Sequence, residues 1–102
     1  MKKIINGKLY NTETATEVGD WCSHLGIRDF GYYEETLYKK RTGEYFLYGS
    51  GNAGSKYSES CGTNTWCGTE RITPLTVDKA KAWAEDHLDA DEYIEIFGEV
   101  EE

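Results

Sequence analysis

The sequence is poor in proline and lacks any long apolar stretch. One proline among 102 residues excludes collagen-like and proline-rich classes. No apolar run approaches the roughly 18–20 residues that a membrane span needs. The start of the chain, Met1–Gly7, reaches polar residues before the hydrophobic region of a signal peptide could form. We therefore expect a soluble, cytoplasmic protein that does not have a membrane as its partner.

Catalytic and cofactor motifs are also missing. The two histidines, His24 and His87, are not accompanied by a Gly-x-Ser-x-Gly or cysteine-protease pattern. Glu34 and Glu35 are adjacent, but neighbours in a strand point to opposite faces, so they cannot share one proton-transfer site. Gly49–Gly51 lacks the Gly-Lys-Ser/Thr ending of a phosphate-binding loop. We expect no enzyme activity and no cofactor, and a binding protein is the better interpretation.

Basic residues are absent from the end of the chain. Residues 85–102 contain nine Asp or Glu and no Lys or Arg, whereas residues 1–84 contain eleven Lys or Arg and ten Asp or Glu. The formal net charge of −8 is therefore confined to this acidic segment. Such a segment repels phosphates, which excludes direct binding of nucleic acid through it, and attracts basic protein surfaces. A solvated tail that only keeps the protein soluble is the alternative.

The three cysteines are an odd number and cannot all pair within one chain. In a reducing compartment the default is three free thiols. Cys22, His24, Cys61 and Cys67 are weak candidates for a zinc site, because their spacing is looser than the usual Cys-x(2–4)-Cys pattern. A disulfide between Cys61 and Cys67 is the other alternative. We expect no metal.

Length and composition predict one domain over residues 1–102. Hydrophobic residues make up 38% of the chain and charged residues 29%, which suits a folded core at this length. The predicted architecture is α+β: a small antiparallel sheet of four or five strands, one C-terminal amphipathic helix and a short terminal helix.

The strands are indicated mainly by turn signals. Asn6-Gly7 between short apolar runs predicts a tight hairpin. Residues 32–39 and 44–48 are rich in aromatic and β-branched side chains, and Arg41–Gly43 between them supplies a turn, so we expect a second hairpin there. Residues 16–21 favour a short strand, although a helical turn near residue 12 is an alternative.

The remaining segments are less regular. We expect residues 23–31 to form a loop. Residues 49–70 are rich in Gly, Ser, Thr and Asn and predict a long loop or an irregular extra strand that carries a contact surface. Residues 71–75 predict a short final strand with Pro74 at an edge.

The C-terminal part predicts two helices. Thr76 is a suitable N-cap for a helix from Val77 to about Leu88, on which His87 is expected to be an ordinary surface or half-buried residue. Asp89 or Asp91 can cap a second, short helix through Phe97, and this helix should end at Gly98. Residues 99–102 should fray.

Several stretches resemble small acidic proteins of phages and mobile elements of Gram-positive gut bacteria. The stretches that carry the resemblance are Met1–Ala15 (MKKIINGKLYNTETA), Tyr33–Tyr48 (YEETLYKKRTGEYFLY), Ser55–Tyr57, Ile72–Thr76 and Ala80–Gly98. The sequence departs from this style between Cys61 and Cys67, where cysteines replace polar residues. In its size, its acidity and its resemblance to proteins of mobile elements, the chain is similar to anti-CRISPR and other anti-defence inhibitors. This resemblance implies a protein that blocks a nuclease at its DNA-binding surface.

The leading hypothesis is therefore a non-enzymatic inhibitor that imitates DNA phosphates with carboxylates. Its partner would be a CRISPR effector nuclease or another basic nucleic-acid-binding protein. The alternative is an accessory protein of a mobile element that binds a partner through its sheet edge or Gly-rich loop; a zinc-stabilised module is a weaker third class. The candidate partner-binding residues are the acidic Glu85, Asp86, Asp89, Asp91, Glu92 and Glu95, together with Tyr57 and Trp66 as exposed aromatic anchors.

Overall fold

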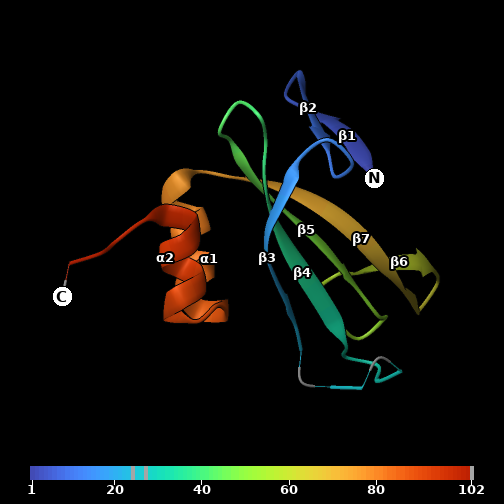
Figure 1. The fold of residues 1–102 in the computed structure, drawn as a ribbon. Coiled ribbons are helices and arrows are strands. Elements are labelled where there is room, and N and C mark those ends of the chain that lie inside the picture. The colour runs from blue at the N-terminus through green and yellow to red at the C-terminus, as the bar shows by residue number, and fades with distance from the viewer. Residues whose placement is uncertain (24, 27, 102) are drawn as a thin grey trace.

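The fold is α+β, with two helices packed on one side of an antiparallel sheet (Figure 1). The computed structural model describes residues 1–23, 25–26 and 28–101. Neither of the helices in these ranges is long and apolar enough to cross a membrane. The elements are β1 (Lys2–Ile5), β2 (Lys8–Asn11), β3 (Thr16–Cys22), β4 (Tyr33–Lys39), β5 (Tyr45–Gly51), β6 (Ser58–Gly62), β7 (Thr65–Leu75), α1 (Val77–His87) and α2 (Ala90–Phe97).

The main sheet has five strands in the order β3-β4-β5-β7-β6, which agrees with the predicted four or five. The first predicted hairpin forms, but β1 and β2 make a separate two-stranded sheet. Its turn residues Asn6 and Gly7 have φ angles of 52° and 78°. Positive φ at both central positions is the backbone that an Asn-Gly pair adopts most readily in a tight hairpin.

The hairpin of β4 and β5 is confirmed at the predicted turn. Leu37 pairs with Leu47 in its register, and Gly43 in the turn has a φ of 91°, which only glycine adopts without strain. Alternation along β4 places Glu35 and Leu37 on one face and Thr36 on the other. Strand β3 is also confirmed and pairs with β4 at the edge of the sheet.

Of the two alternatives for residues 49–70, the irregular extra strand is confirmed as β6, and the long loop is wrong for most of that range. Strand β5 continues to Gly51, and β6 and β7 form a hairpin that turns at Thr63 and Asn64. The eleven-residue β7 pairs with β5 from Thr69 to Leu75, so it is far longer than the predicted short strand. Backbone hydrogen bonds to β5 stabilise this strand in spite of a composition that is typical of loops.

A disulfide between Cys61 and Cys67 joins β6 to β7, with their Cα atoms 5.9 Å apart. Of the alternatives for the cysteines, the disulfide is therefore the one that the structure shows, and the default of three free thiols is wrong: Cys22 alone is free, and it is exposed. Of the weak zinc candidates Cys22, His24, Cys61 and Cys67, the last two are bonded to each other and are not free to bind a metal, and His24 lies outside the described residues. Within the described ranges no group of three His, Cys, Asp or Glu side chains is placed to hold a metal ion.

The sheet is apolar on both faces. On one face Leu37, Tyr45 and Leu47 pack against Trp83 and the alanines of α1. On the other face, the β1–β2 ribbon places Tyr10 against Phe46 and Ile72, and Tyr10 meets Phe46 edge to face with ring centroids 5.5 Å apart. The helices and the ribbon thus cover opposite faces of the same sheet.

Both helices begin at the predicted caps. The Thr76 side chain accepts a hydrogen bond from the backbone N–H of Lys79 (3.2 Å), and Asp89 accepts one from Glu92 (2.8 Å). The second helix ends before Gly98, whose φ is 88°. The described part of the C-terminal tail, residues 99–101, continues without regular structure.

We expect the oxidised, folded protein to react with Ellman's reagent at one thiol per chain, that of Cys22, and at three after reduction. The variant Cys22→Ser should show none before reduction and two afterwards. Three reactive thiols in protein that was never exposed to a reductant would contradict the Cys61–Cys67 pairing.

Candidate functional site

All six acidic candidate residues are exposed on the two helices: Glu85, Asp86, Asp89, Asp91, Glu92 and Glu95. Helix α1 buries Ala80, Trp83 and Ala84 against the sheet. Helix α2 half-buries Tyr93, Ile96 and Phe97 beside the same core. With the apolar side chains turned inward, the helical period leaves the carboxylates on the solvent side. We call this surface of the two helices the acidic hairpin.

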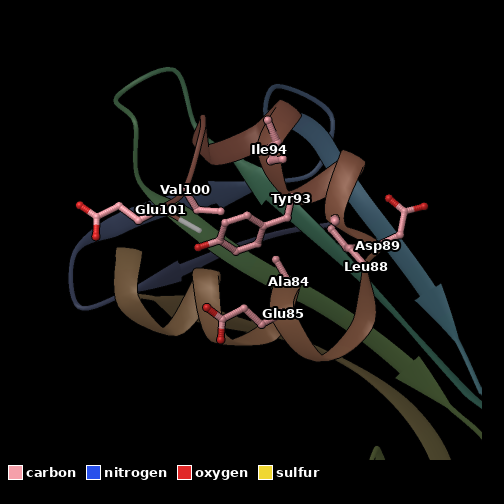
Figure 2. Close-up of a pocket in the computed structure, with 9 residues that line it drawn as sticks. Ala84, Glu85, Leu88, Asp89, Tyr93, Ile94, Val100 and Glu101 are labelled. Carbon is pink, nitrogen blue, oxygen red and sulfur yellow. The ribbon is translucent and has the colours of Figure 1, made fainter.

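An apolar groove of about 470 Å³ lies within the acidic hairpin, between α1, α2 and the C-terminal segment. Figure 2 shows the Tyr93 ring at its centre, with Ala84 and Leu88 on one side and Val100 on the other. Ile94 and Val100 are 39% and 57% exposed, so the groove has an apolar lining that reaches solvent. The carboxylates of Glu85, Asp89 and Glu101 lie around it in the same view.

Among the described residues, lysines lie near this charge without pairing with it: the ammonium group of Lys81 is 6.0 Å from the centroid of the Phe97 ring, and Lys39 lines a small cavity together with Glu95. The Lys residues of the two helices, Lys79 and Lys81, lie in the first half of α1, and residues 85–101 contain neither Lys nor Arg. Within the described residues no ion pair involves a carboxylate of the acidic hairpin. The negative potential there is consequently available to a partner.

The two aromatic candidates have different environments. Trp66 is 58% exposed on β7, next to the disulfide, as an anchor residue should be. Tyr57 is only 4% exposed, so the prediction that it is an exposed anchor is wrong. Its ring lies directly over Gly49 of β5, where a Cβ atom would collide with the ring. The bare backbone of a glycine is what lets Tyr57 enter the sheet face.

The hydroxyl of Tyr57 donates a hydrogen bond to Glu35, whose side chain is fully buried. Trp83 of α1 donates from its indole N–H to the other carboxylate oxygen (3.1 Å), and Lys56 forms an ion pair with Glu35 (2.9 Å). These four residues, with His87, form what we call the Glu35 network. It joins β4, the loop before β6 and α1.

His87 closes the network on the helix side. Its Nδ1 lies 2.8 Å from the Trp83 carbonyl oxygen, which can only accept, so Nδ1 carries a proton. Its Nε2 lies 3.7 Å from the Glu35 carboxylate, and its ring stacks on Trp83 with centroids 4.7 Å apart. The half-buried position of His87 confirms the prediction for this residue.

Burial alone would raise the pKa of Glu35, but the hydrogen bonds from Tyr57, Lys56 and Trp83 together bring it below the ordinary value. Burial and the hydrogen bond to Glu35 raise the pKa of Tyr57. The network therefore holds an ionised carboxylate next to a neutral phenol. Because both carboxylate oxygens are engaged and the side chain is fully buried, its chemistry suits a structural link between sheet and helix.

Sequence reasoning missed the Glu35 network, although one signal was present. Glu35 shares a face of β4 with Leu37, and a carboxylate on the apolar face of a strand needs buried donors. Which donors these are depends on the loop that carries Lys56 and Tyr57, and the sequence does not place that loop.

No family model, no curated protein and no solved structure matches the chain. The functional proposal therefore rests on the geometry and charge of the molecule.

Replacing Tyr57 with Phe should lower the free energy of unfolding by about 1–3 kcal/mol, because a buried carboxylate oxygen loses a donor. The matched control is Tyr32→Phe, since Tyr32 donates to the exposed Glu34 (2.9 Å) and its loss should cost less than about 1 kcal/mol. Urea unfolding measures both. Equal losses in the two variants would contradict the structural role of the Glu35 network.

The stability that Glu35 confers should depend on pH. Its pKa is lowered on folding, so its contribution is complete above the ordinary value of 4.5 and is lost as the pH falls through the lower value of the folded state. Glu35→Gln should therefore be less stable than the wild type near pH 7, and the difference should shrink below about pH 4.5. Urea unfolding of both proteins across this range measures it, and a difference that stays constant with pH would contradict the lowered pKa.

Proposed function

We propose that this protein is a non-enzymatic inhibitor that occupies the nucleic-acid-binding groove of a basic protein with its acidic hairpin. A defence nuclease of the CRISPR type is the partner that the proposal favours. The observation that carries it is the combination of unpaired, exposed carboxylates with an apolar groove among them.

The density of charge is comparable with that of DNA. Helix α2 has eight residues and is therefore about 12 Å long. Duplex DNA carries about seven phosphates over such a length, and the acidic hairpin offers six candidate carboxylates on α2, its cap and the end of α1. A row of Lys and Arg side chains that binds DNA could accept these carboxylates instead.

The apolar groove would add binding energy that exposed ion pairs alone do not provide. Exposed ion pairs contribute at most about 1 kcal/mol each, and salt weakens them. An apolar side chain from the partner that enters the groove beside Tyr93 and Ile94 would bury surface at the centre of the contact, where binding energy concentrates. The groove therefore supports binding of a protein with both basic and apolar side chains.

A second candidate function is protein binding through the β6–β7 arm. Trp66 is exposed there, and β6 is a short strand at the sheet edge with one free side. The burial of Tyr57 removes the other aromatic anchor from this surface. In a reducing cytoplasm the disulfide of the arm would open, whereas the acidic hairpin contains no cysteine and should act with or without a reductant.

The acidic hairpin is tested by neutralising five of its carboxylates together. In the variant Glu85→Gln, Asp86→Asn, Asp91→Asn, Glu92→Gln and Glu95→Gln, the inhibitor should lose most of its ability to displace fluorescently labelled duplex DNA from purified CRISPR effector nucleases. Single changes should have little effect, because each exposed pair is weak. Circular dichroism should show an intact fold, since the five side chains are exposed.

The control variant removes the same charge outside the two helices: Glu13→Gln, Asp20→Asn, Glu34→Gln, Glu59→Gln and Glu70→Gln, all at exposed positions. It should displace DNA as the wild type does, and displacement by both should weaken steeply between about 50 and 200 mM salt. If the hairpin variant displaces DNA as well as the control does, the acidic segment is only a solubilising tail. The arm that carries Trp66 then becomes the leading candidate.

A further inference from the structure

A second pocket, of about 480 Å³, lies between the β1–β2 ribbon and the turn that joins β4 to β5. The ribbon packs on the sheet face opposite to the helices, so this pocket is separate from the apolar groove of the acidic hairpin. Its charged lining is basic: Lys8, Lys40 and Arg41 face one acidic residue, Glu44.

The carboxylate of Glu44 shows how this pocket holds a negatively charged group. Its Oε2 accepts a hydrogen bond from Nζ of Lys8 (3.1 Å), and its Oε1 accepts one from the hydroxyl of Thr42 (3.1 Å). The ammonium group of Lys40 lies 3.5 Å from the same Oε1. Donors from the ribbon and from the β4–β5 turn thus converge on one oxyanion, and the hydrogen bond from Lys8 is the main cause of the lowered pKa of Glu44.

Two of the three positive charges remain unbalanced. Among the described residues, Arg41 takes part in no ion pair, and its guanidinium can bind two oxygens of one phosphate group. Lys40 is already held in place: its side chain is 15% exposed, and its Nζ lies 4.2 Å from the centroid of the Tyr10 ring. A cation that is ordered before binding reduces the entropy cost of the contact.

We propose that this pocket binds a phosphate monoester through Lys8, Lys40 and Arg41. A monoester carries between one and a half and two negative charges near pH 7, which matches the surplus of the pocket, whereas a phosphodiester carries one. Thr42 offers a hydroxyl donor at the same place. Glu44 acts as an internal competitor that keeps the two lysines together while the pocket is empty. This site is independent of the acidic hairpin and of its proposed function.

The test is a titration of the full chain with inorganic phosphate at constant ionic strength, followed by the NMR shifts of the backbone amides of residues 8 and 40–44. We expect saturable shifts with phosphate that equal amounts of chloride do not cause. Arg41→Gln should raise the Kd about tenfold, while Arg28→Gln, an equal change of charge at the opposite end of β4, should leave it unchanged. Glu44→Gln should lower the Kd several-fold, because it removes the competing carboxylate.

Two further titrations distinguish the source of the phosphate. A nucleoside 5′-monophosphate should shift the same amides, and an oligonucleotide without a terminal phosphate should not. Equal binding of that oligonucleotide would overturn the proposal in favour of a phosphodiester site. Two results would show that Glu44 and the two lysines form a surface ion pair and nothing more. In the first, phosphate causes only the shifts that chloride causes; in the second, neither Arg41→Gln nor Glu44→Gln changes the Kd.

Discussion

One buried carboxylate, that of Glu35, restricts how α1 packs on the sheet. Glu35 is ionised in the interior, where an unpaired charge costs several kcal/mol. Its donors come from separate parts of the chain, Trp83 from α1 and Tyr57 from the loop before β6. Because a fully buried carboxylate must be satisfied, the loop and the helix are restricted to positions in which both donors reach it. Apolar side chains in place of the whole network could be as stable, but the loss of one partner leaves a buried charge uncompensated, which is destabilising.

Local signals in the sequence were sufficient for the elements whose ends are determined by a few residues. Asn6-Gly7 and Gly43 specify turns through positive φ, and Thr76 and Asp89 specify helix starts through a side chain that accepts from the backbone. The acidic hairpin followed from the same helix signals, since the period of α1 and α2 determines which side chains face solvent.

What could not be predicted depends on contacts between distant residues. The composition of residues 58–70 is typical of a loop, and the strand pairing that overrides it comes from the β6–β7 hairpin itself and, from Thr69 onward, from β5. The interior position of Tyr57 likewise requires that Gly49 has no side chain. The sequence does not show this requirement, because it does not place the Tyr57 loop next to β5. The apolar groove needs the C-terminal segment beside α2, and no periodicity in the sequence indicates where Val100 lies.

The sheet separates the acidic hairpin from the pocket at Arg41. One face carries the helices and the acidic hairpin, and the other carries the ribbon with Lys8, beside Lys40 of the β4–β5 turn. A molecule with its net charge of −8 concentrated on one side has a strong dipole, which orients it toward a basic surface before contact. The pocket at Arg41 then faces away from such a partner and would remain open to a small anion.

The Glu35 network and the acidic hairpin meet in the last turns of α1. Trp83 and His87 point to Glu35, Ala84 and Leu88 line the groove, and Glu85 lies at its rim. Residues next to one another in a helix cannot move independently, so the link that fixes Trp83 also fixes the α1 wall of the groove. A partner that docks there would meet a surface whose backbone is already ordered, and less conformational entropy is lost when such a surface is bound. The buried carboxylate thus contributes to the proposed binding through the position of the helix, without touching the partner.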